Sequence, residues 1–213
     1  MKKYIIGIIV VIVLLVAVTV VIAVTNKSDI LLDDKSAQSL FEAGKKSFES
    51  TEVVAIVNGE KIYKGKIDYL VTAKEISQKN EEQSSDVSSF SSEDFAEQVL
   101  NEQIRNIVVR QEAERIGLKV SYEESYNEAK NNYDIVKEAG GTNYEIIISF
   151  MNEMGYSEKE YLEKSAEVYA EMLLRGKLYT HFTQDKTGNY EELVELYNIY
   201  VDELIKKADI KYK

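Results

Sequence analysis

The feature that most constrains this chain is an uninterrupted apolar stretch at its N-terminus. Residues 4–24 carry no charge, and Thr19 is their one clearly polar side chain. In a helix these 21 residues span roughly 30 Å, the hydrocarbon thickness of a bilayer. The stretch is rich in Val and Ile, yet in lipid only a helix satisfies every backbone N–H and C=O within one segment. We therefore predict one transmembrane helix and assign residues 1–25 as a membrane anchor.

The flanking charges predict how the anchor is oriented. Lys2 and Lys3 precede the apolar stretch, and positive residues favour the cytoplasmic side of a membrane. The prediction is a single-pass cell-membrane protein with a cytoplasmic N-terminus and an extracytoplasmic domain. A cleaved signal peptide is the alternative, because Val21 and Ala23 suit a cleavage site. The apolar region of a signal peptide is usually shorter, about 7–15 residues, and this favours retention.

The remainder of the chain is acidic. The formal net charge is −11, and removing the two charges of Lys2 and Lys3 leaves −13 after the anchor. Such a domain is repelled by phosphate backbones and anionic head groups, so we predict no nucleic-acid partner. The chain has no cysteine, which excludes disulfides and the usual zinc clusters, and no proline, which removes the strongest helix breaker.

No group of residues in the sequence indicates catalysis. His181 is the single histidine, with Asp185 four residues later, but no serine has the Gly-x-Ser-x-Gly context of a nucleophile. A histidine on the surface near a helix end is the simpler interpretation. Paired glutamates such as Glu123 and Glu124 suit helix first turns better than acid–base chemistry. We predict no catalytic residue, no metal site, no cofactor and no enzymatic activity.

The first part of the soluble region predicts a stalk followed by a β-hairpin. Residues 26–52 form the linking segment, in which 35–50 read as a short helix or a stalk. A β-branched run at 53–57 is followed by Asn58-Gly59, the strongest short signal for a hairpin. A helix over 64–79 comes next. The serine-rich, charged residues 77–92 are predicted to be a polar loop.

The second part is predicted to be almost entirely helical. A helix begins near Ser92 and ends before Gly117, and capping boxes at 121–124 and 157–160 begin two more. A short helix over 143–154 lies between them, and a last helix follows residue 189. The alternating residues 209–213 predict a strand that would pair with 53–57. The fold class is therefore mostly α with a small β element, in one domain over residues 53–213.

These elements, in this order, resemble a known family. Val53-Val54-Ala55-Ile56-Val57 followed by an Asn-Gly-Glu-Lys-Ile turn and a helix looks like the opening of the SurA-type N-terminal chaperone domain, which PrsA-like foldases share. The steps at 108–121, 154–162 and 203–212 are similar to the family's later helices and closing strand. The resemblance covers roughly 53–213. It implies a chaperone that binds unfolded or exported polypeptides and needs no cofactor.

The chain departs from this family at one place. Members often carry a parvulin isomerase domain before the closing helix, whereas here only the short loop 183–189 stands there. We therefore expect no prolyl isomerase activity, and no active-site residue is transferred. The alternative function is a non-catalytic scaffold or interaction subunit of a cell-envelope complex. A homo-oligomer is compatible with either function.

One segment is the candidate peptide-binding site. Residues 144–154 are apolar nearly all round the predicted helix, and methionine is a deformable side chain common at promiscuous binding surfaces. Two interpretations stay open: a helix buried in the core, or one wall of a groove that holds apolar peptide. The candidate binding residues are Tyr144, Ile147, Phe150, Met151 and Met154.

Overall fold

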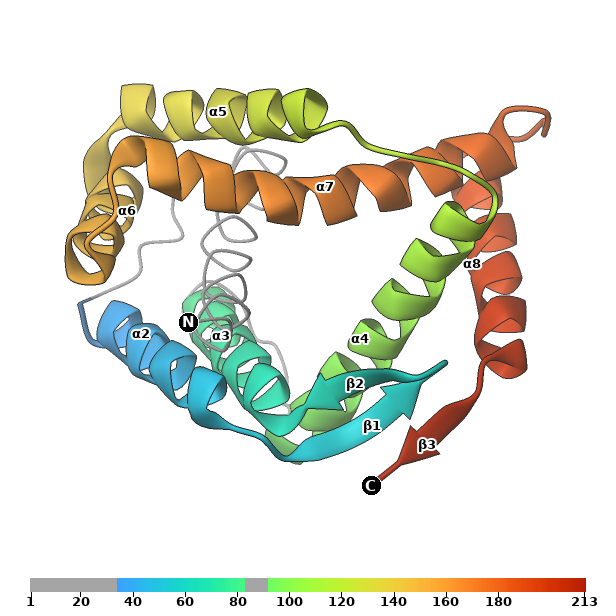
Figure 1. Ribbon diagram of the computed structural model, residues 1–213, viewed down its shortest axis with the longest axis horizontal. Coiled ribbons are helices and arrows are strands. Elements are labelled where there is room, and N and C mark those ends of the chain that lie inside the picture. Colours follow the sequence, from blue (N-terminus) through green and yellow to red (C-terminus); the bar gives the residue numbers. More distant parts are fainter. Residues whose placement is uncertain (1–33, 83–91) are drawn as a thin grey trace.

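The computed structural model describes residues 34–82 and 92–213, which contain seven helices and a three-stranded sheet (Figure 1). The predicted anchor, residues 4–24, lies outside the described residues. Within the described ranges no helix is both long and apolar enough to cross a bilayer. The elements are, in chain order, α2 (Asp34–Glu49), β1 (Val53–Val57), β2 (Glu60–Tyr63), α3 (Lys64–Glu82), α4 (Ser92–Arg115), α5 (Tyr122–Ala139), α6 (Gly141–Met154), α7 (Glu158–Thr183), α8 (Tyr190–Lys207) and β3 (Ile210–Tyr212).

The sheet confirms both β predictions. Strands β1 and β2 form an antiparallel hairpin, and Asn58 and Gly59 between them have φ values of 48° and 89°. Positive φ at both central residues is the requirement of a type I′ turn. Strand β3 pairs antiparallel with the other edge of β1, with Val57 opposite Ile210. The two ends of the domain are therefore joined in one sheet of order β2-β1-β3.

One predicted boundary on the N-terminal side needs correction, and one open alternative is decided. Helix α3 continues to Glu82, so residues 77–82 of the predicted polar loop are helical; residues 83–91 lie outside the described residues. Segment 35–50, predicted as a helix or a stalk, is helical and packs against α3. There Leu40 is buried with Tyr69 and Ile76.

The helix ends follow from local chemistry. The Gly117 N–H donates to the Glu114 carbonyl and the Leu118 N–H to the Ala113 carbonyl, the Schellman pattern that ends α4. Ser157 and Glu160 form the predicted capping box of α7. At the start of α5 the Ser121 side chain caps the Glu124 N–H, and the Glu124 carboxylate accepts a hydrogen bond from Lys177 of α7.

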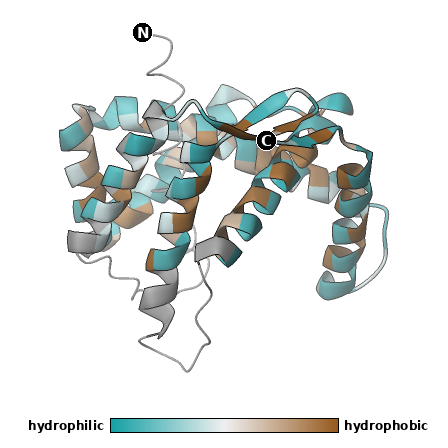
Figure 2. Ribbon diagram, turned by 90° about the horizontal axis from the view of Figure 1, so that it is seen from below, coloured by the Kyte–Doolittle hydropathy of each residue, from teal (hydrophilic) through white to brown (hydrophobic). Residues whose placement is uncertain are grey.

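The described elements pack around two principal cores. The lower core joins the sheet to α3, α4 and α8 through residues such as Val57, Ile67 and Val108, and the upper core joins α5, α6 and α7. Figure 1 shows α5 and α7 side by side along one edge of the molecule and the sheet at the opposite edge. A smaller cluster around Leu178 and Val201 connects the two through α4, α7 and α8. Hydrophobic and hydrophilic positions alternate around the helices (Figure 2), as expected of helices with one buried face.

Candidate peptide-binding groove

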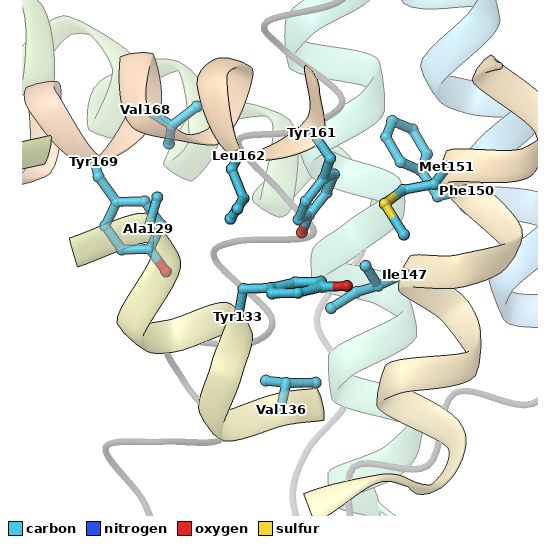
Figure 3. Close-up of a cluster of buried hydrophobic side chains, with 10 residues drawn as sticks. All are labelled: Ala129, Tyr133, Val136, Ile147, Phe150, Met151, Tyr161, Leu162, Val168 and Tyr169. Atoms are coloured by element: carbon cyan, nitrogen blue, oxygen red, sulfur yellow. The ribbon is translucent and has the colours of Figure 1, made fainter. Parts of the chain in front are cut away.

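The predicted binding residues of α6 lie mainly inside the upper core. Figure 3 shows Ile147, Phe150 and Met151 directed toward Tyr133 of α5 and Tyr161 of α7. These three α6 side chains are 1–6% exposed, and the Phe150 and Tyr161 rings meet edge to face at 6.4 Å between centroids.

Tyr144 and Met154 pack at the margin of the same core and are partly buried. In this conformation the α6 segment is therefore a core helix, as one of the two interpretations has it. A role for its residues in peptide binding stays a prediction, because a client would reach them only after α6 separates from α5 and α7.

An open hollow lies between α5 and the C-terminal half of α7. It has a volume of about 740 Å³. Its apolar floor comes from Leu118 after α4 and from Met172 and Leu173 of α7, all of them half-buried. The complete lining is Leu118, Glu124, Glu128, Asn132, Tyr169, Met172, Leu173, Gly176, Lys177, Tyr179, Thr180, His181 and Gln184. We call this hollow the α5–α7 groove.

Gly176 keeps the middle of the groove open. It lies in the interior of α7, and a Cβ built on it would meet no atom within 4 Å. Glycine inside a helix costs roughly 0.5–1 kcal/mol relative to alanine. Neither a positive φ nor a close approach of another segment requires glycine here. The residue therefore lowers helix stability at the position where a side chain would fill the groove.

A polar rim closes one end of the groove. The Lys177 ammonium donates to the Glu124 carboxylate at 2.8 Å and to the Lys119 carbonyl at 2.8 Å. The hydrogen bond from Lys177 lowers the pKa of Glu124, so the carboxylate stays charged at neutral pH. This pair ties α5 to α7 across the groove. Farther along the rim the Asn132 side-chain amide donates to the Glu128 carboxylate at 3.1 Å.

The groove combines apolar and hydrogen-bonding side chains. The floor offers deformable and branched apolar side chains, and the rim offers hydrogen-bonding groups of both signs. His181 is exposed in the last turn of α7, at the groove mouth. Within the ranges 34–82 and 92–213 no three His, Asp or Glu side chains gather as metal ligands.

Leu162 and Tyr169 of α7 are buried, whereas Leu173 is half-buried and lines the groove. Neither Leu173 nor Gly176 was predicted from the sequence to line a binding site. The available signal was the isolated glycine in the middle of a strongly helical segment, which usually has a packing or functional reason.

The fold thus defines a class: a mostly helical domain whose small sheet is closed by its C-terminal strand and whose accessible hollow is apolar with a polar rim. The chain matches the family model of the SurA-like N-terminal domain over residues 1–163. Because this is more than half of its length, the chain belongs to that family, as the sequence resemblance predicted. The matched range includes the N-terminal stretch and ends within α7. No curated protein and no solved structure matches the chain.

Proposed function

We propose that this protein is a membrane-anchored, extracytoplasmic chaperone that holds unfolded or exported polypeptides in the α5–α7 groove without isomerising prolines. The observation that carries the proposal is an open, apolar-floored hollow in a member of the SurA-like N-terminal domain family. Its volume of about 740 Å³ lies in the range of sites that bury several side chains of a ligand.

The physical basis is burial of client apolar surface. At about 25 cal/mol per Å², covering 200 Å² of apolar area yields roughly 5 kcal/mol before ordering costs. Those costs are several kcal/mol for an unfolded segment, so a single groove of this kind gives weak and reversible binding. Such affinity suits a holding chaperone, which must release its client. The predicted anchor would keep this activity at the membrane, where exported chains emerge.

A second candidate function rests on a different surface. Leu196 and Ile199 lie three residues apart on α8, 43% and 55% exposed, among the acidic residues of that helix. An exposed apolar pair of this kind favours a fixed protein partner, which is the scaffold alternative. The groove favours many unfolded clients instead. The two functions therefore assign binding to different helices.

Suppression of aggregation tests the proposal. The full-length protein in zwitterionic nanodiscs is mixed with heat-unfolded citrate synthase, and light scattering is followed over time. The expected result is suppression at micromolar concentration that the Leu173→Ser substitution in the groove weakens and the Leu196→Ser substitution on α8 leaves unchanged. Suppression lost only with Leu196→Ser would place client binding on α8 instead of in the groove, and no suppression by any form would refute the chaperone function.

A further inference from the structure

A second pocket lies on the neighbouring face of α7, enclosed by α4, α7 and α8. Its volume is about 450 Å³. It shares Met172 and Tyr179 with the α5–α7 groove but opens between other helices. The lining is Arg105, Asn106, Val109, Met172, Arg175, Tyr179, Tyr190, Val194 and Tyr197. Two arginines and three tyrosines in one small pocket are unexpected in a chain with a net charge of −11.

The guanidinium of Arg175 is the central group of this pocket. It donates to the Asn106 side-chain oxygen, a neutral acceptor. Within the described residues no carboxylate oxygen lies within 4 Å of it. Burial lowers the pKa of Arg175, and the carboxylate of Glu171, one turn earlier on α7, only partly opposes this. Arg175 is half-buried, and an anion brought into contact with this cation would offset part of its desolvation cost.

Arg105 and Tyr197 also line this pocket. Arg105 donates to the Asn198 side-chain oxygen at 2.7 Å, and the Asp202 carboxylate lies at 3.5 Å, so its fork is not saturated. Burial raises the pKa of Tyr197, and the nearby charges of Arg105 and Arg175 act against this shift. The Tyr197 hydroxyl therefore lies within the field of both guanidiniums. Its ring is held edge to face against Tyr179 at 5.1 Å.

We propose that this pocket binds a carboxylate of a polypeptide, with an adjacent aromatic or aliphatic residue on its apolar wall. A guanidinium presents paired N–H groups that match the two oxygens of a carboxylate. Val109, Met172 and Val194 supply the apolar wall, and Tyr190, 76% exposed, lies at the mouth. The carboxylate belongs to a client C-terminus or to an Asp or Glu side chain. The inference rests on the proposed function, because it names the carboxylate as the feature of the client that this pocket would bind.

Binding of short peptides to the full-length protein in zwitterionic nanodiscs tests the inference by titration calorimetry. Three probes with blocked N-termini are compared: Gly-Ser-Gly-Phe with a free C-terminal carboxylate, the same peptide amidated, and amidated Gly-Ser-Glu-Phe. The expected result is at least tenfold tighter binding of one or both carboxylate probes than of the neutral amide. Preference for the first identifies a C-terminus, and preference for the third a side chain. Equal binding of all three would overturn the proposal.

Variants assign the effect to the pocket. Arg175→Met is expected to abolish the preference for carboxylate, whereas Arg175→Lys keeps part of it. Lys130→Met on α5 removes the same charge from an exposed site and should have no effect. Val194→Asp places a competing carboxylate in the pocket wall and should also abolish the preference, which keeps the test decisive if Arg175→Met does not fold. Unchanged preference in folded Arg175→Met or in Val194→Asp would refute the assignment.

The two proposals fail separately. Carboxylate-dependent peptide binding without aggregation suppression would leave the pocket standing and remove the chaperone function. Aggregation suppression without any carboxylate preference would support the chaperone function and refute carboxylate binding in the pocket. Gly176→Trp, which fills the neighbouring α5–α7 groove, should weaken aggregation suppression and leave the carboxylate preference in place.

Discussion

Replacing Gly176 by tryptophan separates binding from folding. Most substitutions that damage a binding site also damage the fold, but here the new side chain would enter open space, because a Cβ at this position meets nothing within 4 Å. Helix propensity favours tryptophan over glycine by a few tenths of a kcal/mol. We therefore expect an unchanged or slightly higher free energy of unfolding together with a filled groove. Gly176→Ala is the small control, expected to stabilise by roughly 0.5–1 kcal/mol.

The assay uses the absence of tryptophan from the natural chain. In Gly176→Trp the new indole is the only one, so its emission reports the polarity of the groove directly. Stability is measured by thermal unfolding, and client binding by anisotropy of a labelled, reduced and carboxymethylated lactalbumin. The stabilisation by Gly176→Ala corresponds to a midpoint increase of about 1–4 °C for a domain of this size. The tryptophan variant should bind the client at least tenfold more weakly.

Glu167→Trp is the matched control. Glu167 lies nine positions before Gly176, which at about 3.6 residues per turn places it on the opposite, exposed side of α7. This variant should bind the client as the natural chain does. Undiminished binding by a folded Gly176→Trp protein would show that the groove does not hold the client. Equal losses in both tryptophan variants would point to a general effect of an added aromatic residue.

Three further predictions concern stability. The buried Glu112 carboxylate accepts hydrogen bonds from Arg115 and Tyr200 at 2.6–2.8 Å, so Glu112→Gln should cost about 1.5–3 kcal/mol at pH 7. The hydrogen bond from Arg115 lowers the pKa of Glu112 below its value in the unfolded chain, about 4.3. This stabilisation is therefore complete above that value and is lost as the pH falls through the lower folded pKa. Urea unfolding from pH 7 to 3 should show a shrinking difference in unfolding free energy between the natural chain and Glu112→Gln. A constant difference would contradict the assignment. Gly59→Ala should destabilise the hairpin by roughly 1–2 kcal/mol because φ is 89°, and an unchanged urea midpoint would argue against the type I′ turn. Leu178 is fully buried where α4, α7 and α8 meet, so Leu178→Ala should lower the free energy of unfolding by about 2–5 kcal/mol. Leu196 is exposed, and Leu196→Ala should lower it by less than about 0.5 kcal/mol. Similar losses in the two variants would contradict the burial of Leu178 in this cluster.

The features predicted correctly from the sequence were those determined by neighbouring residues. Asn58-Gly59 specifies its own turn, and the Ser157–Glu160 capping box closes within one helical turn. Pairing of the C-terminal strand with β1 was also predicted, because the alternating 209–213 segment had one compatible apolar strand to join. Family membership followed from the order of such local signals.

The features that sequence reasoning missed depend on residues far apart in the chain. The Glu124 carboxylate accepts a hydrogen bond from Lys177, 53 residues later and across the groove, and no local signal predicts this contact. The α5–α7 groove exists only once α5 packs on α7, so Leu173 was indistinguishable from its buried neighbours. Likewise, nothing near Arg175 in the sequence shows that Arg105 and Tyr197 share its pocket. Periodicity shows which helix face is apolar but not which part of that face stays open.

The most direct test of the chaperone function is photo-crosslinking from defined positions. A photoreactive phenylalanine analogue replaces Leu173 in the α5–α7 groove or Leu196 on the outer face of α8, in the full-length protein in nanodiscs. Each form is irradiated with reduced and carboxymethylated lactalbumin and, separately, with the same protein in its native form. The chaperone function predicts cross-links from position 173 to the unfolded form alone, and few from position 196. Cross-links from position 196 alone, or equal labelling of native and unfolded protein, would contradict it.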